Sequence, residues 1–340
     1  MKVLIGVYNI SGYLLAEVRE LCKRAEVTIV ETECCLSDSA HANFPQVKFV
    51  RRTEMAAFPE MGVGDLFLCA GWSDMGFVAL ARQLKKQGVT TVLAIDTPWQ
   101  GKLRQCVHAL YTRFTLTRVF DYGFGAGAPQ ARHLRILGFP RPRIRCGYYS
   151  ADDQKFSVLA QLERKPWPHN FIYVGRYVDV KNMDFMLKCF ITAIEEMPES
   201  DWSFNCIGGG NLFDNRVQHQ RINHLGYKKP YELQNFIGNS GCFVLASTYE
   251  PWGVVVHEFA IAGLPMLCSN LVMSCTAYLQ EGKNGFAFDP HDARGLVEAY
   301  KKIMRMSDAE LESMGKISHR LGMTYTTEDW VNSIMEMAAK

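Results

Sequence analysis

The sequence lacks an apolar run long enough to cross a membrane. A spanning helix needs roughly 18–20 consecutive apolar residues, and the longest candidate, residues 254–268, contains Glu258 and Pro265. Residues 1–8 carry one basic residue and a short apolar run, which favours a buried first strand over a secretory signal. We therefore expect a packed globular protein in the cytoplasm.

Metal-ligand patterns are also missing. The 11 cysteines have none of the paired spacings of a zinc site, and two of them, Cys34 and Cys35, are adjacent. In a chain without an export signal, cysteines in this number favour reduced thiols in the cytoplasm. We predict no metal site and no cofactor.

A strong net charge is missing as well, although the two halves of the chain differ. The formal net charge is +2, but residues 1–150 carry 19 Lys and Arg against 12 Asp and Glu, and residues 151–340 carry 18 against 23. A basic half favours a phosphate-bearing substrate or peripheral contact with an anionic membrane face. Ordinary solvated charge is the alternative interpretation.

Short apolar runs alternate with amphipathic stretches, and this pattern occurs twice. In the first half we expect strands at residues 2–8, 27–31, 47–50, 65–70, 91–95 and 144–148, and helices at 14–24 and 74–87. In the second half we expect strands at 171–174, 202–207, 222–225, 241–245 and 265–268, and helices at 183–195, 230–237, 254–262, 293–306 and 328–339.

This alternation is typical of βαβ units and parallel sheets. We predict an α/β fold of two Rossmann-like doubly wound domains that face a crevice, at residues 1–152 and 170–322. A polar, proline-containing linker is expected at 153–169, and a C-terminal helix at 323–340 that packs back toward the N-terminal domain. Because ligands of such sheets bind beyond the carboxyl ends of the strands, the residues after each strand are the candidates for a site.

The segment 250–258 is the most informative of these strand ends. Gly253 lets a ligand approach the backbone, and Pro251 suits a first helical turn. The free N–H groups of a helix start attract an anion such as a diphosphate. Glu258 stands in an otherwise apolar stretch, and its carboxylate suits the two hydroxyls of a ribose. The alternative is structural: Glu250 caps the helix and Glu258 pairs with a nearby arginine.

The strand at 171–174 is followed by two cations, Arg176 and Lys181. Such a pair can clamp a diphosphate, with arginine as a bidentate fork and lysine as a point charge. Charges at strand ends are also often only solvated.

Three other strand ends carry weaker signals. Gly208-Gly-Gly210 and Gly12 each follow a strand, and each fits either a phosphate site or a tight turn; the three-glycine run lacks a full GxGxxG. Asp96 ends the strand at 91–95, where its carboxylate would face the crevice.

The ordered set of these pieces resembles the retaining GT-B glycosyltransferases, the glycosyltransferase family 4-like or group 1 enzymes. The similarity is good over residues 171–289 and holds only in outline in the first half. The matching pieces are Tyr-Val-Gly-Arg176-(x4)-Lys181-Asn182, Ile207-Gly-Gly-Gly210, Leu225-Gly226-Tyr227, Phe243 to Pro265 around Glu250-Pro-Trp-Gly-Val-Val-Val-His-Glu258, and Asn284-Gly285-Phe286.

The resemblance implies a role for each matching residue. The catalytic set is Glu250, Arg176, Lys181 and Asp96. The donor-binding set is Gly12, Gly175, Gly209, Gly226, Tyr227, Pro251, Trp252, Gly253, Val254, Val255 and Glu258. In this scheme the cations hold the donor diphosphate, Glu258 binds the ribose and Glu250 faces the sugar. The chain departs from the family pattern at Asp96, where many relatives have His, at Trp252, where Phe is commoner, and at residues 273–277, which replace a Gly-Gly-x-x-Glu run.

We therefore predict a metal-independent, retaining hexosyltransferase. It would move a sugar from a nucleotide-diphosphate sugar donor to a saccharide or lipid-linked acceptor in polysaccharide or glycolipid synthesis. We expect the enzyme in the cytoplasm or at the inner face of the membrane, and we expect no contact with nucleic acid. One alternative is a nucleotide-sugar epimerase, for which Asp96, His108 and His257 are the few further candidate groups. The other is a non-catalytic nucleotide-sugar-binding partner subunit.

Overall fold

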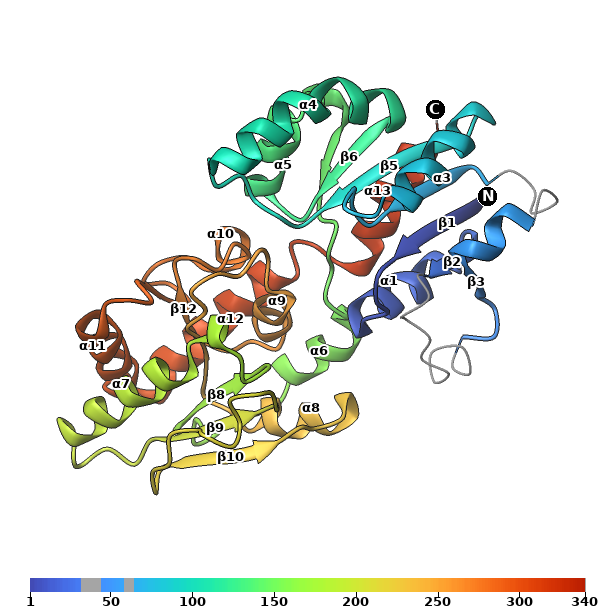
Figure 1. Cartoon of the computed structure of the whole chain (residues 1–340). Helices are drawn as coiled ribbons and strands as arrows, with labels where there is room; N and C mark the ends of the chain where they lie inside the picture. The colour runs from blue at the N-terminus through green and yellow to red at the C-terminus, as the bar shows by residue number, and fades with distance from the viewer. Residues whose placement is uncertain (32–43, 58–63, 340) are drawn as a thin grey trace. The chain divides into compact units, whose positions relative to one another are not determined.

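The computed structural model describes residues 1–31, 44–57 and 64–339, and the chain divides into two compact units (Figure 1). The first unit consists of residues 1–152 together with 325–340, and the second of residues 153–324. Cys34 and Cys35 lie outside the described residues, and every cysteine inside them has a free thiol.

The first unit is built on a seven-stranded parallel sheet with the order β3-β2-β1-β4-β5-β6-β7. Its strands are β1 (Lys2–Val7), β2 (Glu26–Glu31), β3 (Lys48–Arg51), β4 (Leu66–Cys69), β5 (Thr90–Ile95), β6 (Tyr122–Gly125) and β7 (Ile144–Cys146). Its helices are α1 (Gly12–Leu21), α3 (Met75–Lys86), α4 (Leu103–Val119), α5 (Ala128–Ile136) and α13 (Thr327–Ala338), with short 3₁₀ turns at Arg52–Ala57 and Arg141–Arg143.

Helices cover both faces of this sheet, as the alternation of side chains along each strand requires. Leu4 points into a core with α3, α4 and α5, whereas Val3 and Ile5 point into a core with α1 and α13. All three side chains are buried. The apolar runs of the first half are therefore strands buried on both sides.

The last helix, α13, belongs to the first unit and packs against α1, as predicted. A capping box between Thr326 and Asp329 starts the helix. Its Trp330 is fully buried, and the indole N–H donates a 3.0 Å hydrogen bond to the carbonyl of Tyr148. One large side chain thus anchors α13 in the core of the first unit.

The second unit has a six-stranded parallel sheet with the order β10-β9-β8-β11-β12-β13. Its strands are β8 (Asn170–Val174), β9 (Ser203–Ile207), β10 (Ile222–Gly226), β11 (Cys242–Leu245), β12 (Met266–Ser269) and β13 (Gly285–Phe288). Its helices are α6 (Asp153–Ala160), α7 (Met183–Glu195), α8 (Pro230–Gly238), α9 (Val254–Ile261), α10 (Cys275–Tyr278), α11 (Ala293–Met304) and α12 (Asp308–Gly322), with a 3₁₀ turn, η3, at Asp179–Lys181.

An aromatic cluster fills one side of the second sheet. Phe171 of β8 lies 4.5 Å from the ring of Trp202 and 4.8 Å from that of Tyr300, and it also contacts Phe190 of α7. The Tyr300 hydroxyl donates a 3.2 Å hydrogen bond to the carbonyl of Met186, which satisfies its only polar group in the core.

The predicted fold class is confirmed: both halves are Rossmann-like parallel sheets, and the architecture is GT-B-like. The sequence did not predict α4, β6, α5, α10, α12 or β13. The segment expected as a linker, 153–169, contains α6, which packs against α8, α9 and α12 of the second unit.

Candidate active site

The carboxyl edge of the second sheet holds most of the predicted site residues. The strand order reverses between β8 and β11, because β9 and β10 extend the sheet on one side and β12 and β13 on the other. Arg176 and Lys181 follow β8, and Glu250 follows β11. These residues therefore flank the switch point of the sheet, where doubly wound folds bind their ligands.

Lys181 ends η3 and forms an ion pair with the Glu250 carboxylate. Asn182 follows with a left-handed backbone (φ 56°), which lets the chain turn from η3 into α7. The two segments are joined by a second contact, a 2.9 Å hydrogen bond from the Thr248 N–H to the Val180 carbonyl. The two paired side chains are only 14% and 17% exposed, so both charges are held in place at the sheet edge.

Glu250 is fixed by its backbone as well. Its N–H donates to the Leu271 carbonyl at 3.2 Å, and its carbonyl accepts from the Met273 N–H at 3.2 Å, which forms a bridge to the loop after β12. The structural alternative for Glu250 is wrong, since the N-cap of α9 is Gly253 and the carboxylate pairs with Lys181 instead.

The helix α9 begins at Val254, so Pro251 lies before the helix and not in its first turn as expected. Gly253 has φ 89°, and a Cβ atom there would lie 2.8 Å from Cγ of Glu250. Only glycine suits this position. Because Gly253 has no side chain to cap α9, the first-turn N–H groups have no side-chain acceptor and keep the positive end of the helix dipole available to an anion.

Residues 273–277, which depart from the family pattern, support this turn. Ser274 donates from its backbone N–H to the Trp252 carbonyl and from its hydroxyl to the Gly253 carbonyl, both at 3.0 Å. The Trp252 side chain is 3% exposed and packs edge-on against Tyr278. Trp252 is therefore a buried support of the turn.

The two ionisable residues of α9 differ in their surroundings. His257 is fully buried, stacks on Tyr278 with ring centroids 4.1 Å apart and contacts the Gly322 carbonyl through Nε2 at 2.8 Å. These contacts give His257 a structural role. Glu258 is half-buried and lies one turn into the helix.

Glycines line the adjoining strand ends, for two different reasons. A Cβ atom on Gly208 would lie 1.8 Å from the Gly175 carbonyl oxygen, and one on Gly210 would lie 2.3 Å from the Tyr177 carbonyl oxygen. Both are therefore needed for close backbone packing. A Cβ atom on Gly209 or Gly226 would meet nothing within 4 Å, so these two glycines border open space.

Tyr227 follows Gly226, and its side chain is 75% exposed. The three-glycine turn is thus partly structural, with Gly209 and the neighbouring Gly226–Tyr227 pair open to a ligand. Arg176 is exposed, and its carbonyl accepts a 2.8 Å hydrogen bond from the Tyr173 hydroxyl.

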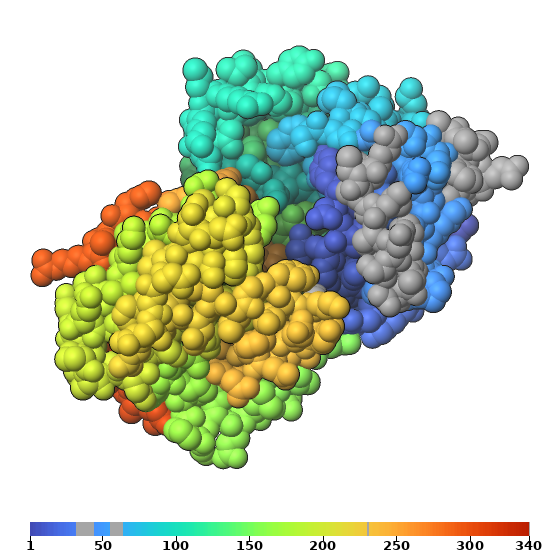
Figure 2. Space-filling model, turned by 60° about the horizontal axis from the view of Figure 1, so that its bottom comes forward, coloured from blue at the N-terminus to red at the C-terminus, as the bar shows by residue number. Residues whose placement is uncertain are grey.

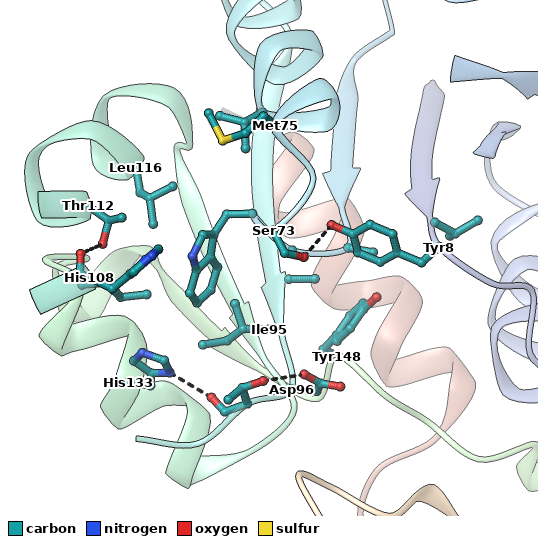
Figure 3. A pocket seen from close by; sticks show the side chains of 18 of the residues that line it. Tyr8, Ser73, Met75, Ile95, Asp96, His108, Thr112, Leu116, His133 and Tyr148 are labelled. Atoms are coloured by element: carbon teal, nitrogen blue, oxygen red, sulfur yellow. Dashed lines mark hydrogen bonds between the residues drawn. The ribbon is translucent and has the colours of Figure 1, made fainter. Parts of the chain in front are cut away.

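The first unit contains a cavity of about 930 Å³ at the carboxyl edge of its own sheet (Figure 3). Figure 3 shows His108 and His133 on one side of it and Tyr8 on the other. Six aromatic side chains contribute to the lining: Tyr8, Tyr13, Trp72, Tyr111, Tyr148 and Tyr149. Aromatic faces with a few polar groups suit a ligand that is apolar on its faces and hydroxylated at its edges, as a sugar ring is.

Asp96 follows β5 and lines this cavity. Its carboxylate accepts hydrogen bonds from the Thr97 hydroxyl at 3.1 Å and the Tyr149 hydroxyl at 3.3 Å. Desolvation by burial raises the pKa of Tyr149, with the neighbouring Tyr148 and Asp96 adding to the effect, so its hydroxyl stays a donor. Asp96 is therefore held as an acceptor at the cavity wall.

Burial disfavours the charged forms of two further groups in the cavity wall. Burial raises the pKa of Glu17 well above its ordinary value of 4.5, although the Ser150 N–H donates to the carboxyl at 2.7 Å. Burial also lowers the pKa of His133, whose Nδ1 contacts the Thr97 carbonyl at 2.9 Å. The cavity wall also includes the acidic Asp96 and the basic Arg82, Lys102 and Arg104.

The structure brings most of the predicted residues together in the second unit and places Asp96 and Gly12 in the first. Gly12 begins α1, and its neighbours Ser11 and Tyr13 line the cavity. Sequence reasoning missed the aromatic lining, Glu17 and His133. Trp72 after β4 and Tyr148-Tyr149 after β7 stand just beyond strand ends, and that position was the available signal.

Among residues 1–31, 44–57 and 64–339, no group of three or more His, Cys, Asp or Glu side chains is placed to hold a metal ion. No helix in the described part of the chain has the length and apolarity to span a membrane.

Comparison with known proteins bears on the second unit above all. Residues 158–320 match the family model described as glycosyl transferases group 1. The second unit therefore contains a domain of the glycosyl transferases group 1 family. A curated relative, the GtfA subunit of the UDP-N-acetylglucosamine–peptide N-acetylglucosaminyltransferase of Streptococcus pneumoniae, is 24% identical over 181 residues. That alignment covers 50% of this chain and 36% of the relative, so the chain spans about a third of that protein's length.

Solved structures of similar fold cover nearly the whole of the chain. HepE of Anabaena, in complex with UDP and glucose, has a TM-score of 0.72 at 11% identity, over 99% of this chain and 98% of its own. The lipopolysaccharide outer core galactosyltransferase WaaB has a TM-score of 0.70 at 16% identity, over 99% of each chain. Identities this low show the fold alone.

Proposed function

We propose that this chain is a retaining, metal-independent glycosyltransferase that uses a UDP-sugar donor. The observation that carries the proposal is the arrangement at the switch point of the second sheet, where the Lys181–Glu250 pair lies beside the uncapped start of α9. Membership of the group 1 family supports the reaction class, and the UDP bound to HepE supports the nucleotide.

In the proposed reaction, Arg176 and Lys181 stabilise the diphosphate as it leaves the anomeric carbon. The acceptor hydroxyl forms the new bond on the same face of the sugar, and its proton passes to the departing phosphate. Lys181 exchanges its contact with Glu250 for the diphosphate, which frees Glu250 for the sugar hydroxyls. Catalysis then rests on positioning and charge stabilisation, without a protein nucleophile.

The acceptor in this proposal is a saccharide or a lipid-linked saccharide that binds in the cavity of the first unit. Its aromatic lining and the Asp96 carboxylate fit a hydroxylated ring. The outer core reaction named for WaaB supports a pathway of polysaccharide or glycolipid synthesis.

A panel of nucleotide sugars tests the proposal. We expect one UDP-sugar to raise the melting temperature, because a ligand that binds only the folded state stabilises it. The same donor should be hydrolysed slowly to UDP and sugar, with no loss of rate in EDTA. Glu258→Ala should weaken donor binding in calorimetry while the thermal midpoint without ligand is kept. Metal-dependent turnover, or an unchanged affinity in Glu258→Ala, would contradict the assignment.

The partner-subunit alternative has one specific observation in its favour, since the pneumococcal relative is named as a subunit. It predicts that a UDP-sugar binds without turnover, whether or not acceptors are present. Release of an isomeric nucleotide sugar in the absence of an acceptor would instead favour an epimerase.

A further inference from the structure

The helix α4 is apolar on two opposite faces. One face packs into the core of the first unit through Ala109, Leu116 and Val119, which are 4–6% exposed. The other carries five large apolar side chains that are 62–81% exposed: Leu103, Val107, Leu110, Tyr111 and Phe114. We refer to these five residues as the α4 stripe.

The α4 stripe is continuous along the helix. Its members stand at positions i, i+4, i+7, i+8 and i+11, and on an α-helix such residues fall within a band about 100° wide. The band is opposite the buried face, and Figures 1 and 2 show α4 (teal) at the outer surface of the first unit. Scattered apolar residues on a surface are ordinary, but a contiguous exposed patch marks an interaction site.

The charge around the stripe has one sign. The helix itself contains Arg104, Arg113 and Arg118 and no acidic residue, and Lys102 precedes it. Residues 101–150 hold nine Lys and Arg against one acidic residue, Asp121. That carboxylate is engaged by Lys85 at 3.2 Å. The surface is therefore complementary to a negatively charged partner.

We propose that the α4 stripe docks the first unit on an anionic lipid bilayer. An amphipathic helix with large apolar side chains and flanking arginines lies in the plane of the lipid–water interface, with its apolar side buried about 5–10 Å deep. The attraction of each basic residue to an anionic leaflet adds to that burial. With 17 residues and its other face in the protein core, α4 lies on the bilayer and does not cross it.

A second copy of the chain fits this surface less well. In a symmetric dimer the same patch faces itself, so the arginines of one copy would meet those of the other. Like charges placed together at an interface disfavour association. The basic flanks therefore select a lipid surface as the occupant.

Docking through α4 has a consequence for the cavity of the first unit. Lys102, Arg104, His108 and Tyr111 of the same helical segment also line that cavity. A bilayer against the stripe would therefore lie beside the cavity wall, where a lipid-linked acceptor would present its saccharide. This step rests on the proposed function, whereas bilayer binding itself can be measured without donor or acceptor.

Vesicle flotation of the full chain tests the docking directly. We expect the protein to float with phosphatidylcholine vesicles that contain phosphatidylglycerol and to remain free with phosphatidylcholine alone at physiological salt. The double variant Leu110→Glu/Phe114→Glu should lower the affinity at least about tenfold, because two large apolar side chains are lost from the interface. Since both positions are exposed, the thermal midpoint should be unchanged.

A matched double variant provides the control. Val158 and Tyr231 are 50% and 68% exposed on helices of the second unit, so Val158→Glu/Tyr231→Glu adds the same charges away from α4 and should float as the wild type does. Arg104→Ala and Arg113→Ala should each weaken binding to the anionic vesicles about fivefold.

Three results would overturn the proposal. The first is no binding of the wild type to anionic vesicles, and the second is equal binding by the α4 double variant. The third is a dimer in light scattering that the α4 double variant dissolves while vesicle binding persists. Failure of donor turnover alone would leave the flotation result standing and count only against the proposed function.

Discussion

The two sheets end in different kinds of site. At the edge of the second sheet, a Lys181–Glu250 ion pair and an uncapped helix start present charge and backbone N–H groups. At the edge of the first, aromatic side chains from several elements enclose a cavity in which burial disfavours the charged forms of Glu17 and His133. The family model matches residues 158–320, which lie in the second unit.

This difference fits the proposed function, in which the second unit binds the donor and the first unit binds the acceptor. A diphosphate is common to many donors, so the group that holds it can be kept as a fixed set of charges and glycines. An acceptor differs from one enzyme to the next, and a cavity lined by side chains can change while the sheet beneath it stays the same. The following predictions test whether the two edges are in fact independent.

The largest effect is expected at the charged edge. In the proposed reaction Lys181→Ala removes a cation from the donor diphosphate, so donor hydrolysis should slow by about 10²–10³-fold. Release of UDP from the donor found in the panel gives the rate. Lys188→Ala is the matched control, because this lysine is 69% exposed on α7 and pairs only loosely with Asp184, at 3.9 Å. A wild-type rate in Lys181→Ala would remove the ion pair from the proposed site.

The three-glycine turn allows stability and binding to be separated. Gly210→Ala places a Cβ atom against the Tyr177 carbonyl at a backbone φ of 154°, so the free energy of unfolding should fall by about 3 kcal/mol in urea denaturation. Gly209→Ala should leave it unchanged to within about 0.5 kcal/mol and weaken donor binding instead, since its Cβ atom faces open space. Equal losses of stability in both variants would show that the turn is only structural.

Asp96→Asn tests the edge of the first sheet. The amide keeps the shape of the carboxylate and loses its charge, so transfer to the acceptor should slow about tenfold through weaker hydrogen bonds. Donor affinity in calorimetry should stay at the wild-type value. A parallel loss of donor affinity would mean that the two edges are coupled, and the comparison would fail.

The smallest effect concerns the buried carboxyl of Glu17. Its folded-state pKa is raised, so the folded protein holds this proton more tightly than the unfolded chain does. The resulting stability is fully present below pH 4.5, the ordinary value, and is lost as the pH rises toward the folded-state pKa. Glu17→Gln removes this dependence.

From pH 5 to pH 8 the free energy of unfolding of the wild type should therefore fall by at least about 1 kcal/mol relative to that of Glu17→Gln. Urea denaturation of both proteins at the two pH values measures the difference. A difference that does not change with pH would mean that the Glu17 carboxyl ionises normally in the fold.

The sequence was sufficient for the class of fold and for much of the charged edge. Buried parallel strands appear as short apolar runs, and Gly253 and Lys181 stand at fixed spacings from Glu250 and β8, so a linear pattern preserves their geometry. Details that depend on tertiary contacts were not predicted correctly. Pro251 lies before the helix because the chain first forms a bridge to the loop after β12.

Two of the misses have an identifiable cause. Periodicity detects a helix by contrast between its faces, and α4 is apolar on both, so the contrast is weak. The cavity lining was missed because its members come from elements far apart in the sequence, such as Tyr8 and Tyr149, and only the folded sheet brings them together. Whether Glu250 caps the helix likewise needed the structure, which places Gly253 at the N-cap of α9.

The return of α13 to the first unit has a consequence for synthesis. The ribosome makes residues 153–324, the whole of the second unit, before it makes Trp330, which completes the core of the first. Domains usually fold in the order in which they emerge. Here α1 lacks its partner helix while the second unit folds. The apolar surface of α1 therefore stays exposed until α13 has been made.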